Sequence, residues 1–192
     1  MLVWFVCIIP IMLLILLGIT DFGTAALARI ELQNAVEAAA LSAVKTWPKH
    51  GIPAAYRDAE VVFAANAITA RKLGERTAAA DDFIESTSTI FGFLDDTAGV
   101  FVFHPWSGGR NGADAADETS SIQPPGPSFA YCVCVRKSVR VRGLAPVGAS
   151  LSLGPYITTA ESYARLCPER GVPQLVHVDG IADTGLQTLP SR

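Results

Sequence analysis

Charge is missing from the start of the chain: Met1–Thr20 contains no charged side chain, and Asp21 is the first residue that carries one. About twenty apolar residues, at a rise of about 1.5 Å each, span the ~30 Å hydrocarbon core of a bilayer. Pro10 lies inside this run and is tolerated in membrane helices. The sequence therefore predicts a transmembrane segment over residues 1–21.

Two other kinds of segment share this lack of charge. A helix buried inside a soluble domain can be apolar on every side. A cleaved signal peptide is the stronger alternative, because Ala26-Leu27-Ala28 has the small-x-small pattern of a cleavage site. Against cleavage, the apolar run is too long for a signal peptide and no Lys or Arg precedes it.

Positive charge is also scarce. The net charge is −3, and all charged side chains lie beyond residue 20. This balance excludes strong attraction to nucleic acid, so we expect no nucleic-acid partner.

Residues that carry chemistry are equally sparse. The three histidines, His50, His104 and His177, stand apart from other ligand-forming residues, except for Asp179 near His177. No nucleotide-binding or hydrolase motif is present. The glycines of 107–112 lack the strand and helix that a phosphate-binding loop needs. The sequence therefore predicts no catalytic, cofactor-binding or metal-binding residue, and no cofactor.

Of the four cysteines, Cys7 lies in the apolar run. In an oxidising compartment, Cys167 can form a disulfide with Cys132 or Cys134. Cys132 and Cys134 share one strand face and are poorly placed to bridge each other. Free thiols and a three-cysteine metal site remain as alternatives, although no fourth ligand stands at a recognisable spacing.

The chain past the apolar run favours helix. Thr24–Lys45 has neither Gly nor Pro and is rich in Ala, Leu and Glu. We expect one helix from about Leu2 to Lys45, transmembrane in its first half and exposed to water over 22–46. The run Trp47–Gly51 ends it, and a second helix is predicted over 53–74, with Gly74 as its cap.

The outer half of the first helix is the predicted interaction surface. Its larger residues recur at three- and four-residue steps, and its alanines permit close approach of another helix. The residues that define this predicted surface are Leu27, Ile30, Asn34, Ala39, Leu41 and Val44. The alternative is that this stripe only seats the helix on its own domain.

Beyond residue 80 the apolar pattern changes to period two. Strands are predicted from about 82 to 178, beginning with a hairpin whose turn is Asp95–Gly99. A flexible loop is expected over 107–128, rich in Gly and Pro, and a loose tail over 181–192. The predicted fold is α+β: a long N-terminal helix, a second helix and a small antiparallel sheet, with an extracytoplasmic domain over 22–180.

The stretch Ile9–Ala43 resembles the opening of TadE/TadG-like proteins of the tight-adherence (Flp) pilus system. Two motifs carry the resemblance: the exit Gly18-Ile19-Thr20-Asp21-Phe22-Gly23, and the run Arg29-Ile30-Glu31-Leu32-Gln33-Asn34-Ala35-Val36-Glu37-Ala38-Ala39-Ala40-Leu41. The strands of 92–101 and 131–165 are similar to those of the family more loosely.

This resemblance implies a non-enzymatic pilus-assembly or minor pilin-like component. It implies a single-pass protein of the inner membrane whose domain faces the periplasm or the cell exterior. Its expected partners are other pilus-assembly or pilin-like proteins, and a homo-oligomer is one arrangement. The alternative is an exported ligand-binding or enzyme domain on an N-terminal signal anchor.

Overall fold

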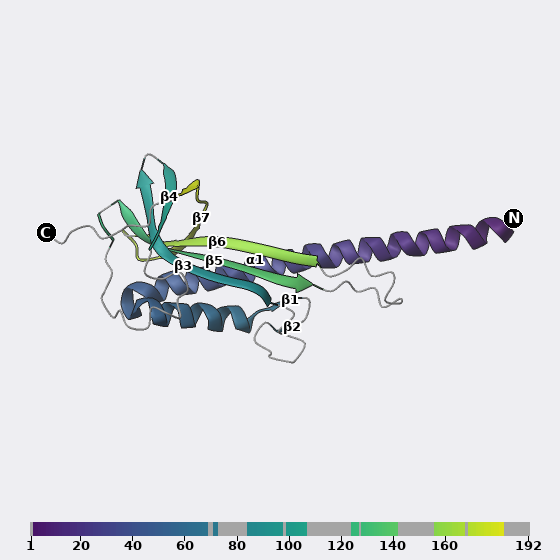
Figure 1. Ribbon diagram of the computed structural model, residues 1–192, viewed down its shortest axis with the longest axis horizontal. Helices are drawn as coiled ribbons and strands as arrows, with labels where there is room; N and C mark the ends of the chain where they lie inside the picture. The colour runs from purple at the N-terminus through teal and green to yellow at the C-terminus, as the bar shows by residue number, and fades with distance from the viewer. Residues whose placement is uncertain are drawn as a thin grey trace.

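The computed structural model describes residues 2–68, 71–72, 84–97, 99–106, 124–126, 128–141, 156–167 and 169–182. The fold is α+β. A long helix, α1 (Leu2–Ala65), projects far beyond a sheet that packs against its outer half (Figure 1). A two-stranded ladder, β1 (Ala67–Ile68) and β2 (Arg71–Lys72), follows the helix.

The six-stranded sheet is formed by the remaining strands. They are β3 (Ile84–Thr97), β4 (Val100–Pro105), β5 (Phe129–Val141), β6 (Tyr156–Leu166), β7 (Pro173–Val176) and β8 (Gly180–Ile181). Their order across the sheet is β7-β6-β5-β3-β4-β8. The loop predicted over 107–128 and the tail over 181–192 lie largely outside the described residues.

Helix α1 continues without a break from the apolar run into the domain, so the predicted helix from about Leu2 to Lys45 is confirmed. Its first interruption is Gly51, whose φ of 79° and ψ of 175° are not helical. Only glycine adopts this region at low cost, because a Cβ there clashes with the backbone. Figure 1 shows the helix doubling back after this point, and Thr46 Oγ1 donates a hydrogen bond of 2.6 Å to Asp58 Oδ2 across the turn.

The predicted second helix over 53–74 needs correction. Residues 53–65 are helical but form the return arm of α1, which we define as Pro53–Ala65. The helix then ends well before Gly74, because the Asn66 side-chain amide donates to the Val62 carbonyl at 2.7 Å and caps the last turn. The chain turns at once into β1 and β2, while residues 73 and 74 lie outside the described part.

The sheet is mixed, so the prediction of an antiparallel sheet also needs correction. The predicted hairpin is present as β3 and β4, and β5, β6 and β7 continue antiparallel on the other side of β3. Strand β8 instead pairs in parallel with β4. The reason is the short connection from β7, which consists of residues 177–179 only, although the two strands lie at opposite ends of the strand order. The chain does not reverse there, so β8 keeps the direction of β7, which is also the direction of β4.

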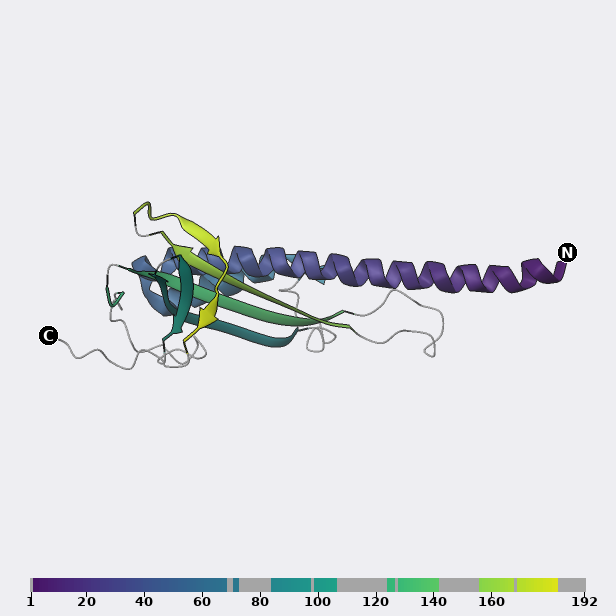
Figure 2. The same ribbon diagram turned by 90° about the horizontal axis from the view of Figure 1, so that it is seen from above.

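This short connection requires the sheet to curl until its two ends meet, and Figure 2 shows the chain crossing from β7 to the β4 side. Asp179 holds the segment between β7 and β8 against β4 through two hydrogen bonds. Its N–H donates to the Phe101 carbonyl, and its Oδ2 accepts from the Phe101 N–H, both at 3.0 Å. A small second core fills the curl. It contains Leu94, Phe103, Cys132 and Cys134, with Ile90, Phe101, Tyr163, Val176 and Val178 packed against them.

The main core lies between α1 and the other face of the sheet, which we call the helix-facing side. Trp47 packs edge-on against Phe91, with ring centroids 5.3 Å apart. The buried residues of this core alternate along the strands as period two requires. They include Leu32, Val36 and Val44 from the helix, and Phe91, Phe93, Val133, Val135 and Val139 from the strands.

Gly92 lets β4 approach β3 closely at the start of the curl. A Cβ at this position would lie 2.3 Å from the His104 carbonyl oxygen and 2.8 Å from the Phe103 ring. The strand pair therefore requires glycine there, because the backbone oxygen cannot move without breaking the ladder.

The turn in α1 depends on the backbone freedom of Gly51. Replacing Gly51 with Ala should lower the free energy of unfolding by about 1–3 kcal/mol, because alanine is strained at this φ and ψ. Gly180→Ala is the matched control, since Gly180 has an ordinary φ and open space where a Cβ would lie. Urea unfolding of both variants measures the difference. Equal stability of the two variants would contradict the role of the Gly51 turn.

Candidate functional site

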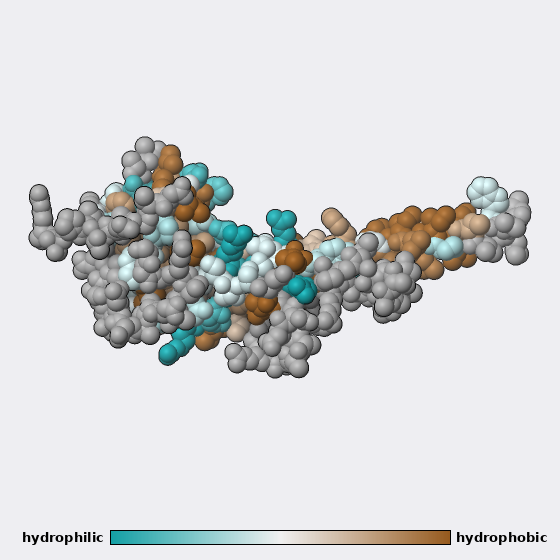
Figure 3. All heavy atoms as spheres, viewed as in Figure 1, coloured by the Kyte–Doolittle hydropathy of each residue, from teal (hydrophilic) through white to brown (hydrophobic). Residues whose placement is uncertain are grey.

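The first half of α1 exposes a band of large apolar side chains. The helix is long and apolar enough to cross a membrane, as judged by length and composition. The exposed residues are Ile8, Ile9, Ile11, Met12, Leu13, Leu14, Ile15, Leu16 and Ile19. Figure 3 shows this band along the projecting helix, away from the sheet. An N-terminal helix of this kind suits a membrane anchor or a signal sequence.

Exposed apolar residues continue past the first charged residue. Phe22 is 78% exposed and Ile30 is 60% exposed. Phe22, Ala26, Ile30 and Asn34 follow one another at four-residue steps, which places them on one side of the helix. All four are exposed, and Leu27 flanks them. We call this set the outer stripe.

The structure divides the predicted interaction surface. Leu27, Ile30 and Asn34 are exposed and belong to the outer stripe, whereas Leu41 is half-buried. Ala39 and Val44 have no exposed surface and pack in the chain's own core. Ala39 and Val44 therefore pack the helix on its own sheet, which is the alternative to an interaction surface that the sequence left open.

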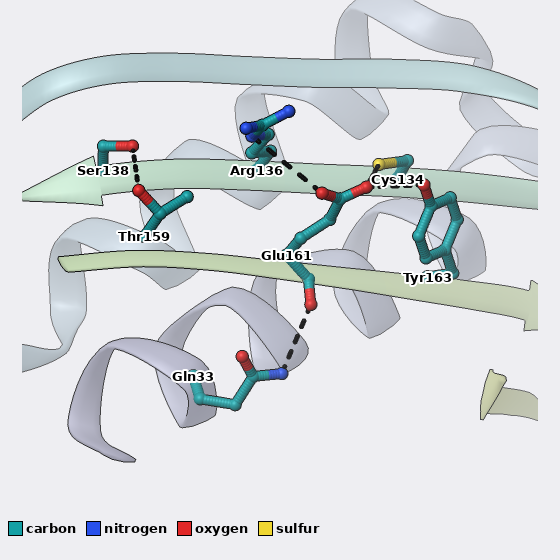
Figure 4. A network of polar contacts seen from close by, with 7 residues as sticks. All are labelled: Gln33, Cys134, Arg136, Ser138, Thr159, Glu161 and Tyr163. Atoms are coloured by element: carbon teal, nitrogen blue, oxygen red, sulfur yellow. Dashed lines mark hydrogen bonds and ion pairs between the residues drawn. The ribbon is translucent and has the colours of Figure 1, made fainter. Parts of the chain in front are cut away.

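A polar network covers part of the face of the sheet that points away from α1, and Glu161 lies at its centre (Figure 4). Tyr163 Oη donates to Glu161 Oε1 at 2.5 Å, and Cys134 Sγ donates to the same oxygen at 3.6 Å. Arg136 Nε lies 3.9 Å from Glu161 Oε2 in a largely exposed ion pair. Period two on the adjacent strands β5 and β6 brings these side chains to one face.

Burial keeps the cysteine thiols of this network neutral. Burial, and then the charge of Glu161, raises the pKa of Cys134 to about 12, and burial also raises the pKa of Cys132. Burial and the hydrogen bond to Glu161 raise the pKa of Tyr163 in the same way. A thiol must ionise to act as a nucleophile, so neither buried cysteine is suited to covalent catalysis.

The three downstream cysteines are free thiols in this structure. Cys132 lies opposite Arg165, and Cys134 lies opposite Tyr163, so neither faces Cys167 directly across the ladder. The disulfide of Cys167 with Cys132 or Cys134 stays a prediction.

Sequence reasoning missed an ion pair on the helix-facing side in which the lysine is buried and the glutamate side chain is 36% exposed. Lys137 is 1% exposed, and its Nζ lies 2.6 Å from Glu60 Oε1 on the return arm of α1. The same Nζ lies 4.6 Å from the centroid of the Phe63 ring. Burial lowers the pKa of Lys137, and the Glu60 carboxylate opposes that shift. Alternation along β5 places Lys137 on the same face as Val135 and Val139. This spacing in the sequence could have indicated that the lysine is buried.

The histidines are separated in the structure as in the sequence. His50 is exposed near the turn of α1, and His104 packs against Phe129 with ring centroids 5.6 Å apart. Within the described residues, no three His, Cys, Asp or Glu side chains gather closely enough to hold a metal ion. The glycine-rich run 107–112 and the acidic run 117–121 lie outside the described residues.

A pocket of about 320 Å³ opens where β7 leaves β6, beside α1. Gln33 and Glu37 line it from the helix, and Gln33 Nε2 donates to Glu37 Oε1 at 2.8 Å. The strands contribute Glu161, Ser162, Tyr163, Leu175, Val176, His177 and Val178. The sequence did not indicate this pocket, because its walls come from segments more than a hundred residues apart.

The N-terminal part of the chain is similar to a known family. Residues 1–50 match the family described as "Putative Flp pilus-assembly TadE/G-like", so the resemblance seen in the sequence is confirmed over these residues. That description implies a Flp pilus-assembly component with an N-terminal hydrophobic helix. Searches of curated proteins and of solved structures found no match.

Burial of Lys137 beside Glu60 makes the stability of the fold depend on pH. Because the folded-state pKa of Lys137 lies below its ordinary value of 10.5, the folded protein binds fewer protons at this residue than the unfolded protein does. Wild-type stability should therefore gain a contribution as the pH rises through the lowered pKa toward 10.5.

Lys137→Met removes this contribution while keeping the length of the side chain, so its stability relative to wild type should fall as the pH rises. Urea unfolding of both proteins at neutral and alkaline pH measures the difference, and other alkaline groups affect both proteins alike. A difference that does not change with pH would contradict the burial of this lysine.

Proposed function

We propose that this chain is a membrane-anchored, non-enzymatic component of a Flp-type pilus-assembly system. Its domain lies outside the cytoplasm, and its outer stripe binds neighbouring pilin-like or assembly proteins in or near the inner membrane. The match of residues 1–50 to the TadE/G-like family supports this role. The observation that carries the proposal is the apolar exposure of the same helix from Ile8 to Ile30.

Physical chemistry explains why such a surface needs a partner. Fully covering one large apolar side chain contributes roughly 1.5–3 kcal/mol. The band from Ile8 to Ile19 is long enough to be covered by lipid. Phe22, Leu27 and Ile30 follow directly, where charged residues such as Asp21 and Arg29 begin. Packing against another helix is the simplest way to cover them, since Gly23 and Ala26 permit close approach.

The competing function, a catalytic domain on a signal anchor, finds less support. Burial keeps the thiols of Cys132 and Cys134 neutral, and Glu161 is engaged by Tyr163 and Arg136. This constellation contains no activated nucleophile paired with a base. An assembly role needs only surfaces, and the helix supplies one.

Membrane anchoring is the first test of this function. The full-length chain should fractionate with membranes and resist extraction by alkaline carbonate, because the charge-free segment Met1–Thr20 spans the bilayer. Immunoblotting of the fractions measures this. Recovery of a soluble mature chain that begins at Arg29 would show that the segment is a cleaved signal peptide instead.

The outer stripe is tested by a pair of variants. Ile30→Arg should abolish co-purification with a second, differently tagged copy or with pilin-like proteins of the same system. Its domain should stay folded, since exposed substitutions change stability by about 0.5 kcal/mol or less. Val61→Arg is the matched control, because Val61 is 62% exposed on the return arm and outside the stripe.

Equal co-purification of the two variants would show that the stripe is not the interaction surface. Ala39→Arg is unsuitable for this test, because Ala39 is fully buried and a charge there would disrupt the core.

A further inference from the structure

The outward edge of β6 is only partly covered within the residues that the structure describes. Strand β5 pairs with Tyr156–Arg165 on one side. On the other side, β7 pairs with Tyr163–Leu166 and then turns away. The edge Tyr156–Ser162 therefore has no strand beside it among the described residues. An uncovered edge presents a row of backbone donors and acceptors that suits another extended chain.

The direction of these backbone groups follows from two hydrogen bonds. The Cys167 N–H donates to the Val172 carbonyl at 3.0 Å, so this residue points its backbone toward the β7 side. The Glu161 carbonyl accepts from Gln33 Nε2 at 3.4 Å, a long bond on the same side. Because backbone groups alternate along an antiparallel strand, Ile157 and Thr159 also direct their N–H and C=O groups outward.

Charge adds a preference for one kind of side chain. Glu37 and Glu161 are among the residues that line the pocket at the end of this edge, and its described lining residues include His177 but no Lys or Arg. Arg136 reaches Glu161 from the outer side of the sheet, but at 3.9 Å and largely exposed. Figure 4 shows Gln33 of α1 reaching the backbone carbonyl of Glu161, whose carboxylate turns away from α1 toward Cys134, Arg136 and Tyr163. A basic side chain on an added strand would complement the pocket.

We propose that the edge Tyr156–Ser162 binds an extended segment of a partner protein by strand addition, with a Lys or Arg of that segment in the pocket beside Glu37 and Glu161. Backbone hydrogen bonds supply affinity in this mode, and alternate side chains supply specificity. The edge belongs to the folded domain, so strand addition there does not depend on the proposed membrane anchor or pilus role.

A second copy of this chain fits the edge less well. Strand β6 lies alongside α1 (Figure 1), so antiparallel pairing of two β6 edges would direct the two N-terminal helices in opposite directions. It would also place two acidic pockets on one interface, where like charges repel. A different, basic chain avoids both problems.

The test uses the full chain in detergent micelles and a synthetic strand peptide. The peptide matches the length of the edge, alternates valine with threonine and has a central lysine. Thr159→Pro removes one outward N–H and leaves the β5 ladder intact, as proline is tolerated on edge strands. Thr159→Val is the matched control, because both variants lose the 2.8 Å hydroxyl contact with Ser138 but only proline loses the N–H.

Binding is followed by NMR titration, and hydrogen exchange is recorded on the free protein. We expect fast exchange at Ile157 and Thr159, shifts centred on Tyr156–Ser162 when the peptide binds, and affinity about tenfold weaker for Thr159→Pro than for Thr159→Val. The same peptide with glutamate in place of lysine should bind at least about tenfold more weakly. If Thr159→Pro does not fold, a peptide N-methylated on alternate amides replaces it and should not bind to wild type.

Three results would overturn the proposal. Slow exchange of the Ile157 and Thr159 amides in the free protein would show that another part of the chain already covers the edge. Binding that is absent, or equal for the Thr159→Pro and Thr159→Val variants, would exclude strand addition. Equal affinity for the lysine and glutamate peptides would exclude the basic partner.

Discussion

The alanine-rich side of α1 packs closely on the sheet, and this contact joins the folded domain to the projecting part of the helix. Ala35, Ala39, Ala40 and Ala43 have no exposed surface, and their small side chains let the helix lie close to the valines of β5. The same helix is apolar and exposed from Ile8 to Ile19. Because the helix has no break between these two parts, the domain is held in a fixed position relative to the N-terminal half, with no flexible linker.

The remaining inner surface of the sheet is covered by the return arm, and its position is set by polar contacts as much as by apolar ones. The arm begins at the glycine-only turn at Gly51 and is held to the sheet by Glu60, which meets the buried Lys137. The pair itself adds little net stability, but moving Glu60 away would leave the buried charge of Lys137 without its partner, which is costly. The pair therefore fixes where the arm lies, while Phe63 supplies the apolar contact.

Local patterns were sufficient to predict the continuous helix, the β3–β4 hairpin and the strands on either side of residues 142–155. They were insufficient where distant segments decide the outcome. The second helix ends early because Asn66 caps it, and the sheet is mixed because three residues join β7 to β8 across the curl. Sequence also assigned Ala39 and Val44 to an interaction surface, since an apolar stripe looks the same whether its own sheet or a neighbour covers it. The pocket and the uncovered β6 edge depend on the pairing of strands, which no single segment encodes.

Beyond Asp21, α1 carries both a buried side and an exposed outer stripe, and we propose that its first part, up to Ile19, faces lipid. Spin labels placed singly along α1 in a reconstituted bilayer test this most directly, through their collision rates with oxygen and with a water-soluble nickel reagent. We expect oxygen to reach labels on all sides of the helix from Ile8 to Ile19. Labels at Ala26, Ile30 and Asn34, which share one side, should also be reached, and a label at Ala39 should not. Uniform access to the nickel reagent along Ile8–Ile19, or free access at Ala39, would contradict it.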